Sequence, residues 1–449
     1  MKINMLSCIA FSSLVLFACS SSKKLKAVKP IVATEIISIK KDDTVVNRIR
    51  PEIDPAKTDS FLVNILNKYP QYFDSVLKNR KAWNVQIIYT QINRDENNKP
   101  SFIDYYFNVD SSKYFYPAST VKLPIALLAL QKLNELNNTG IKRNTSMITE
   151  TGYNGQSSTY NDPQTIDGRP NVESYIKRIF LVSDNEAFNR LYEFLGQKYI
   201  NEQLHEKGYA DAQILHRLEI SLSEDENRHT NPINFLDSND NVLYHQPLKF
   251  NTESYPERHD SLGQGYLNSG CVMNRPMNFS KKNRICLEDL HHILRSVIFP
   301  ENVPVKSKFN LTQDDYEFVH KYMSEFPSES DYPAYDSTLY PDAYLKFLLY
   351  GSRKEALPKN IRIFNKSGDA YGQLIDVTYI TDLDKNIEFF LSATIYCNSD
   401  GILNDDKYDY DSIGLPFMKN LGQVIYDYEL KRKRQYQPNL SSFKIIYDK

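Results

Sequence analysis

The sequence lacks a dominant charge. Lysine and arginine together number 54, against 56 aspartate and glutamate residues, which gives a formal net charge of -2. This balance leaves no whole-chain basic field of the kind that holds phosphate backbones, so we expect no nucleic-acid partner. With 449 residues, 41% hydrophobic and 24% charged, the chain has an ordinary globular composition and room for one large or two modest domains.

Metal-binding patterns are also missing. No Cys-x-x-Cys occurs, and the eight histidines show no ligand spacing. His291 and His292 are adjacent on a predicted helix and would point to different sides. The sequence therefore predicts neither a metal site nor a cofactor.

The N-terminal sequence is typical of a targeting signal and not of a membrane-spanning helix. Met5 to Phe17 is mostly apolar but too short to cross a bilayer, and Lys2 precedes it. The run ends in Leu16-Phe17-Ala18-Cys19, which resembles a bacterial lipoprotein cleavage site. We expect a lipoprotein signal peptide over 1–19, an acylated Cys19 and a polar, flexible tether over 20–57. The alternative is an ordinary signal peptide with an incidental cysteine.

Either reading predicts export. The lipoprotein reading places the protein in the periplasm or on the outer membrane, with the lipid as its only membrane contact. Three cysteines then remain, Cys271, Cys286 and Cys397. An oxidising compartment would allow one disulfide and one free thiol, and Cys271 with Cys286 is the closer pair in sequence.

Hydrophobic spacing predicts the order of elements. We expect helices over 60–78 broken at Pro70, strands over 85–92 and 102–109, a mainly helical middle over 119–345 with loops such as 221–265, strands over 361–365, 373–381 and 387–396, and a helix over 417–430. This order indicates an α+β domain over 58–430 in which strands distant in sequence share one sheet. A solvated basic tail is expected over 431–449, and the site is expected between the sheet and the helical part.

A serine and a lysine precede a strongly apolar helical run. Ser119 and Lys122, three residues apart, share one helix face. A serine in the first turn has a free backbone N–H and lies at the positive end of the helix dipole, which favours an oxyanion. A lysine kept neutral by desolvation could accept the hydroxyl proton. Ser-x-x-Lys alone carries little weight, because Ser75, Ser174 and Ser441 also begin such a pattern.

Two further polar triplets follow. Ser183-Asp184-Asn185 lies between two helical stretches and could equally be a helix cap. Lys366-Ser367-Gly368 ends a strand and could equally be a turn with a solvated lysine.

Taken in order, the three motifs resemble those of the class A β-lactamases and penicillin-binding proteins. The longer run Ser183 to Asn189 is similar to the family's Ser-Asp-Asn-x-Ala-x-Asn signature, and Asp376 falls near a family aspartate. The resemblance covers about residues 60–220 and 270–430. It implies a five-stranded antiparallel sheet flanked by helices, with an all-helical subdomain across the cleft.

The resemblance also implies roles. Ser119 would be the acylated nucleophile and Lys122 the proton relay, while Ser183 would pass a proton to the leaving nitrogen. Lys366 would supply positive charge opposite Ser183. Substrate binding would fall to Asn185, Ser367, Gly368 and Asp369, with an oxyanion hole made by the backbone N–H groups of Ser119 and Asp369.

One departure concerns deacylation. Class A enzymes have, after Arg-Leu-Asp, a loop glutamate that activates water. Here His216 to Leu222 begins like that loop, but Leu222 stands at the glutamate position. Glu224 or Glu226 could substitute, or could simply solvate the loop. Without a positioned base, the acyl-enzyme would hydrolyse slowly.

A second departure is length. The excess lies mostly in 233–283 and 325–357, and such long connections are often functional loops that could narrow the cleft. The sequence favours a monomeric serine acyl-hydrolase acting on β-lactams or a related amide or ester. A D-alanyl peptidase or transpeptidase acting on peptidoglycan-derived peptides and a slowly deacylating penicillin-binding sensor are the alternatives.

Overall fold

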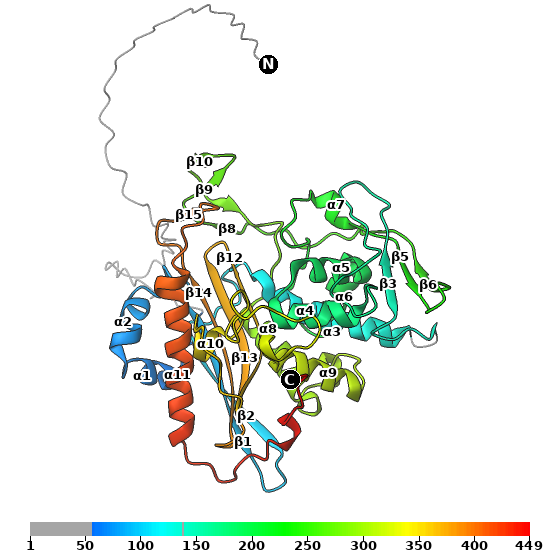
Figure 1. Ribbon diagram of the computed structural model, residues 1–449. Helices are drawn as coiled ribbons and strands as arrows, with labels where there is room; N and C mark the ends of the chain where they lie inside the picture. The colour runs from blue at the N-terminus through cyan, green and yellow to red at the C-terminus, as the bar shows by residue number, and fades with distance from the viewer. Residues whose placement is uncertain (1–55, 137–138) are drawn as a thin grey trace, which may run out of the picture. The chain divides into compact units, whose positions relative to one another are not determined.

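The computed structural model describes residues 56–136 and 139–449, which belong to one compact unit (Figure 1). The signal peptide over 1–19, with Cys19, and all of the tether except its last two residues lie outside the described residues. Lys57 already pairs with Val109 through two backbone hydrogen bonds of 2.8 and 3.0 Å. The folded unit therefore includes Lys57.

The helices follow the predicted order. They are α1 (Ser60–Leu66), α2 (Pro70–Lys78), α3 (Lys122–Glu135), α4 (Val172–Val182), α5 (Asn185–Leu195), α6 (Gln197–Glu206), α7 (Glu224–Arg228), α8 (Leu287–Ile298), α9 (Gln313–Ser324), the short α10 (Phe347–Tyr350) and α11 (Leu415–Lys431). The expected break at Pro70 is confirmed, because Pro70 opens α2 where a missing N–H costs nothing. No helix among the described residues has the length and apolarity needed to cross a bilayer.

A five-stranded antiparallel sheet forms the centre, in the order β12-β13-β14-β1-β2. Its strands are β1 (Gln86–Arg94), β2 (Pro100–Phe107), β12 (Ile361–Ala370), β13 (Gln373–Asp382) and β14 (Ile387–Tyr396). The two early strands and the three late ones join where β1 pairs with β14, with Ile88 opposite Ser392. The α+β fold expected from the sequence is thus confirmed.

Helices cover both faces of this sheet because its strands alternate apolar side chains. On one face, Ile87 and Leu391 pack with residues of α1, α2 and α11. On the other face, Ile88 and Phe390 pack with α8 and with the helical part that contains α3, α4 and α5. Side chains on both faces are buried, so the sheet is a rigid support for groups on its edge strand β12.

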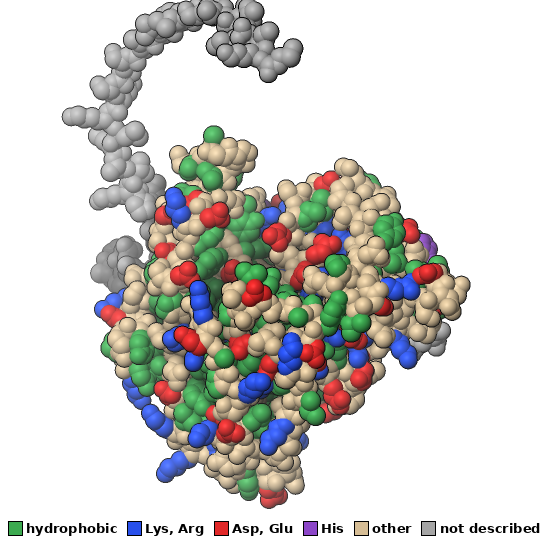
Figure 2. Space-filling view, in the orientation of Figure 1, with side chains coloured by type: hydrophobic (Ala, Val, Ile, Leu, Met, Phe, Trp, Pro, Cys, Tyr) green, Lys and Arg blue, Asp and Glu red, His purple; other side chains and the backbone are tan. Residues whose placement is uncertain are grey.

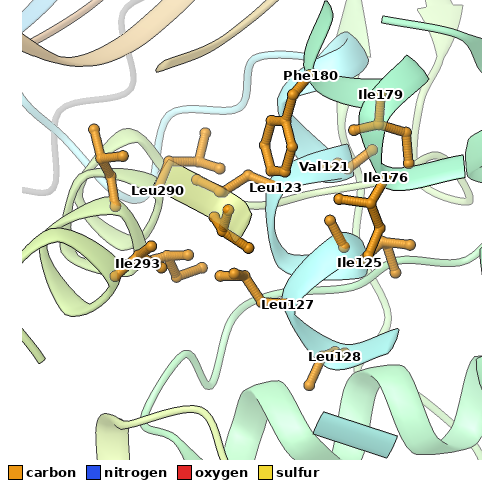
Figure 3. Close-up of a cluster of buried hydrophobic side chains, with 14 of the residues drawn as sticks. Val121, Leu123, Ile125, Leu127, Leu128, Ile176, Ile179, Phe180, Leu290 and Ile293 are labelled. Atoms are coloured by element: carbon orange, nitrogen blue, oxygen red, sulfur yellow. The ribbon is translucent and has the colours of Figure 1, made fainter. Parts of the chain in front are cut away.

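Helix α3 is buried almost all round. Every residue from Leu123 to Leu130 is buried. Figure 3 shows side chains of α3, of the turn before it, of α4 and of α8 meeting in one cluster: Val121, Leu123, Ile125, Leu127, Leu128, Ile176, Ile179, Phe180, Leu290 and Ile293. A helix apolar on all sides belongs in the core, and its burial fixes the position of the residues at its N-terminus.

The predicted loops over 221–265 are wrong in part, because this stretch contains strands. Small sheets are built from β3 (Ser146–Thr149), β4 (His229–Thr230), β5 (Ile233–Leu236), β6 (Val242–Gln246), β7 (Lys249–Phe250), β8 (Ser261–Leu262), β9 (Gly265–Asn268), β10 (Cys271–Met273), β11 (Met277–Asn278) and β15 (Ile402–Leu403). The alternation of buried and part-exposed residues in β5 covers only four positions, so it does not stand out in this polar stretch of the sequence. The helical subdomain therefore also has a three-stranded sheet, β3-β5-β6.

Two smaller expectations also change. Cys271, Cys286 and Cys397 are all free thiols, so Cys271 and Cys286 form no disulfide. The prediction of a solvated basic run is wrong in part: Lys431 and Lys433 are exposed, but the side chains of Arg432 and Arg434 are 6% and 7% exposed and both pair with Glu429 of α11. Phe443 further along is buried in the core. On the face shown in Figure 2, acidic and basic side chains are interspersed.

Glu429 offers a test of this C-terminal packing. Its buried carboxylate accepts hydrogen bonds from Tyr89, Arg432 and Arg434. Glu429→Ala leaves two arginines with little solvent and no counter-charge, so we expect a loss of about 3–5 kcal/mol in the free energy of unfolding. Urea denaturation measures this loss. The control is Glu202→Ala, which breaks an exposed pair with Lys198 and should leave the midpoint unchanged; equal midpoints for both variants would contradict the assignment.

Candidate active site

Ser119 lies in a short 3₁₀ turn, η1 (Ala118–Val121), that runs directly into α3. Ala118 has a positive φ of 48°, which is strained for a residue with a side chain. The buried side chains of Ala118 and Val121 hold the turn in place. The strain and the packing together fix where the hydroxyl of Ser119 points.

Lys122 places its amine among four oxygen atoms. Its Nζ lies 2.9 Å from Ser119 Oγ, 3.1 Å from Ser183 Oγ, 2.5 Å from the Ser183 carbonyl oxygen and 2.5 Å from Asn185 Oδ1. Burial, followed by the charge of Lys366, lowers the pKa of Lys122 well below its usual value, although nearby carboxylates oppose the shift. The amine is therefore poised to be neutral.

The two kinds of acceptor around Lys122 have different consequences. The Ser183 carbonyl and Asn185 Oδ1 can only accept, so they take the two N–H bonds of a neutral amine. The lone pair is then left for a hydroxyl, and the hydroxyls in reach belong to Ser119 and Ser183. This geometry suits proton transfer from a serine to the lysine.

Ser183 lies at the junction of two helices. It ends α4 in the left-handed conformation, with φ at 58°, and Asp184 caps α5 by accepting from the Ala187 N–H at 2.9 Å. The expected helix-capping role therefore belongs to Asp184. The hydroxyl of Ser183 is left to lie between the amines of Lys122 and Lys366, at 3.1 and 2.9 Å.

Lys366 comes from β12 and connects the sheet to the helical part. Besides Ser183 Oγ, its Nζ donates to the Ser367 carbonyl at 2.7 Å. Burial lowers the pKa of Lys366 to about 7, although the carboxylates of Asp376 and Asp369 oppose this shift. Ser119, Lys122, Ser183, Asn185 and Lys366, which come from the three motifs, thus share one hydrogen-bonded network.

Gly368 permits the close approach of β12 to the serine turn. A Cβ atom at this position would lie 2.6 Å from the Ser119 backbone nitrogen and 3.0 Å from that of Thr120. Only glycine fits there without moving backbone. The two segments expected to supply the oxyanion hole, at Ser119 and Asp369, therefore run side by side.

The side chains of Ser367 and Asp369 make no hydrogen bond to the two lysine amines. The Ser367 hydroxyl is buried and has no hydrogen-bond partner among the described residues, which leaves it open to a ligand. The pKa of the Asp369 carboxyl is raised by desolvation, while Lys366 and Lys122 pull it down. Their substrate-binding roles stay predictions.

The expected substitutes for the loop glutamate do not join the network. Glu226 is tied up in a capping box with Ser223, at 2.7 Å, and Glu224 pairs with Arg228 at 3.2 Å. Leu222 packs its methyl group towards Gly155. Both substitutes are anchored to their own short helix α7, so neither is positioned to reach the serine.

Glu219 is the carboxylate that the sequence reading missed. It lies in the left-handed region, with φ at 58°, and its Oε2 accepts from Asn185 Nδ2 at 2.6 Å. Asn185 in turn accepts from Lys122, so one amide group links the carboxylate to the amine beside Ser119. A positive φ at a glutamate cannot be predicted from the sequence. This backbone conformation changes the direction of the Glu219 side chain.

The strand behind Lys366 is supported by a second buried cluster. Lys346, from the segment 325–357, donates to Asn365 Oδ1 at 2.7 Å, and Asn365 donates to Asp376 at 2.8 Å. Burial lowers the pKa of Lys346 to about 7 and raises that of Asp376 to about 6. Part of the segment expected to narrow the cleft is thus a buried brace for β12. Among the described residues, no group of His, Cys, Asp and Glu is arranged to hold a metal.

Comparisons with known proteins bear on the family of this chain. The model of the beta-lactamase enzyme family matches residues 70–303, more than half of the chain. A class A beta-lactamase from Clostridium kluyveri is 15% identical, with a TM-score of 0.42 over 80% of this chain and 98% of that one. A beta-lactamase from Chitinophaga pinensis is 12% identical, with a TM-score of 0.46 over 81% and 99%. The structure of PBP-A is 14% identical, with a TM-score of 0.46 over 83% and 97%.

A comparison with curated proteins gives no match. From the family match, the chain belongs to the beta-lactamase enzyme family and is a β-lactamase-like hydrolase.

The buried lysines lead to a prediction on proton binding. Because the pKa values of Lys346 and Lys366 lie near 7 instead of 10.5, the folded protein binds fewer protons than the unfolded chain between these values. The unfavourable contribution of both lysines to the free energy of folding is therefore at its full size below about pH 7. It becomes smaller as the pH rises from 7 towards 10.5. With ¹³C-labelled lysine, NMR should show two Cε resonances that titrate near pH 7. Lys346→Met should remove one and Lys366→Met the other. Titration of every lysine near 10.5 would contradict the buried network.

Proposed function

We propose that the protein is a serine acyl-hydrolase that forms an acyl-enzyme on Ser119 with β-lactams or a related amide or ester. The observation that carries this proposal is the Lys122 amine, which is buried, favoured to be neutral and 2.9 Å from Ser119 Oγ. A serine beside such a base is an activated nucleophile. A D-alanyl peptidase would need the same groups, and the substrate decides between these activities.

The acylation step follows from this arrangement. Ser119 Oγ attacks the carbonyl carbon while its proton passes to Lys122 Nζ. The negative oxygen that forms is held by the backbone N–H groups of Ser119 and Asp369, beside the positive end of η1 and α3. Ser183 then gives its proton to the leaving nitrogen and is reprotonated from Lys122, with Lys366 stabilising the charge on the Ser183 oxygen.

We further propose that Glu219 is the base for the second step. Its carboxylate is held by Asn185, whose other end contacts Lys122. A water molecule between Glu219 and the acyl carbon would give its proton to the carboxylate and its oxygen to the acyl group. The proton taken up by Glu219 would then pass through the Lys122 amine to Ser119 Oγ, which leaves as a hydroxyl, and Glu219 and Lys122 return to their starting states. This replaces the missing glutamate at position 222 by one three residues earlier.

Export and lipidation are part of the same proposal. The ending Leu16-Phe17-Ala18-Cys19 supports a lipid anchor at Cys19 on an exported bacterial protein. The substrate would then be a small molecule or a peptidoglycan-derived acyl donor met outside the cytoplasm by a monomeric enzyme.

Fluorescent penicillin tests the nucleophile. We expect it to label the full chain covalently and Ser119→Ala to abolish labelling, because this variant lacks the attacking oxygen. The matched control is Ser441→Ala, since Ser441 also begins a Ser-x-x-Lys pattern. Equal labelling of the Ser119→Ala variant would end the proposal.

The lifetime of the adduct tests Glu219. Intact-protein mass spectrometry after a penicillin pulse should show slower adduct release by about 10²-fold or more in Glu219→Gln, with acylation retained. Glu224→Gln and Glu226→Gln serve as controls in the same loop and should release at the wild-type rate. A wild-type adduct that persists as long as that of Glu219→Gln would favour a penicillin-binding sensor instead.

A further inference from the structure

A cavity borders the residues that follow Glu219, and the residues of the serine and lysine network do not line it. Its volume is about 270 Å³. One wall comes from residues 213–228, including Ile220 to Leu222, and the other from 255–258 and 278–282 of the long insertion. The long insertion thus supplies one wall of a cavity that is partly open to solvent.

His216, one of the residues that line this cavity, has an unsatisfied ring nitrogen. Its ring is stacked on Tyr116, with 4° between the ring planes. Nδ1 lies 2.5 Å from the Arg217 carbonyl oxygen, which can only accept, so Nδ1 bears the proton. Burial, followed by the charge of Lys282, lowers the pKa of His216 to about 4. The neutral ring therefore has a lone pair on Nε2, which is buried and without a partner among the described residues.

Two cations line the same cavity without full compensation. Lys282 is half-buried, and its side chain makes no hydrogen bond or ion pair with any described residue. Arg258 is 3.3 Å from Asp260 and donates to backbone carbonyls through Nη2, but its Nη1 is buried and unpaired.

The acids of the cavity do not remove this imbalance. Glu224 is already engaged by Arg228 at 3.2 Å and Lys281 at 3.5 Å. Glu257 lines the cavity but is exposed to solvent. Three residues that line the cavity, Lys282, Arg258 and His216, therefore have two donors and one acceptor without a described partner. Unpaired buried polar groups are rare in folded proteins, and a ligand is one way to satisfy them.

We propose that this cavity binds a phosphate group, either free phosphate or a small phosphate ester. Negative phosphate oxygens would accept from Lys282 Nζ and Arg258 Nη1. A monoprotonated phosphate also has an O–H that can donate to His216 Nε2, whereas an ionised carboxylate has none. The volume limits the ligand to a phosphate with a small substituent. This site does not depend on the role of Ser119.

Histidine NMR on the full chain, with ¹⁵N-labelled histidine, tests the proposal. Near pH 6, where phosphate keeps a proton, inorganic phosphate should shift the His216 nitrogen resonances in a saturable way at constant ionic strength. Acetate should bind at least about tenfold more weakly, because it lacks the O–H donor. Tighter binding of glucose 6-phosphate than of phosphate identifies an ester as the ligand, and equal or weaker binding identifies free phosphate.

A matched pair of variants locates the site. Lys282→Gln should weaken phosphate binding by about tenfold, since it removes a charged hydrogen bond. Lys306→Gln removes an exposed lysine far along the chain and should leave binding unchanged. An unshifted His216 spectrum of the ligand-free Lys282→Gln variant checks that the cavity is intact. Absence of a saturable shift, equal binding of acetate, or unchanged affinity of Lys282→Gln would overturn the proposal.

Discussion

The burial of one lysine amine is the constraint on which the site depends. Lys122 is 0% exposed, yet its Nζ is surrounded by oxygen atoms from Ser119 and from the α4–α5 junction at Ser183 and Asn185. A buried charged amine is costly, so the surroundings favour the neutral form and its lone pair. The same hydrogen bonds fix the positions of Ser119, Ser183 and Asn185. The burial of Lys122 among these hydrogen-bond partners thus accounts both for its expected reactivity as a base and for the positions of the residues around it.

The fold supplies the rigidity that this arrangement needs. Helix α3 is packed on all sides, so the serine turn at its start cannot shift without disturbing the core. On the opposite side, β12 is held in register by β13 and braced from behind by Lys346 through Asn365. Lys366 can therefore keep its amine 2.9 Å from Ser183 although 183 residues separate the two in sequence.

The loop after Arg217 shows how local backbone conformation can change chemistry. Leu222 stands where the family resemblance expects a base, and this alone suggests a long-lived acyl-enzyme. The left-handed backbone at Glu219 brings a different carboxylate to Asn185. Arg217 anchors the loop through a buried ion pair with Glu193 at 2.9 Å, and Asn189 holds Leu218 through its backbone. The carboxylate is thus held by the loop's own packing.

Sequence alone determined the fold class, the positions of the five long strands and the residues of the three motifs. These follow from short-range patterns: alternation for strands, helical spacing for α3, and polar triplets at the ends of elements. Only the tertiary structure decided which carboxylate reaches the site, that Lys346 braces β12, and that the C-terminal arginines are buried against Glu429. Each of these depends on a backbone turn or on contacts between segments far apart in the chain, and neither leaves a local pattern to read.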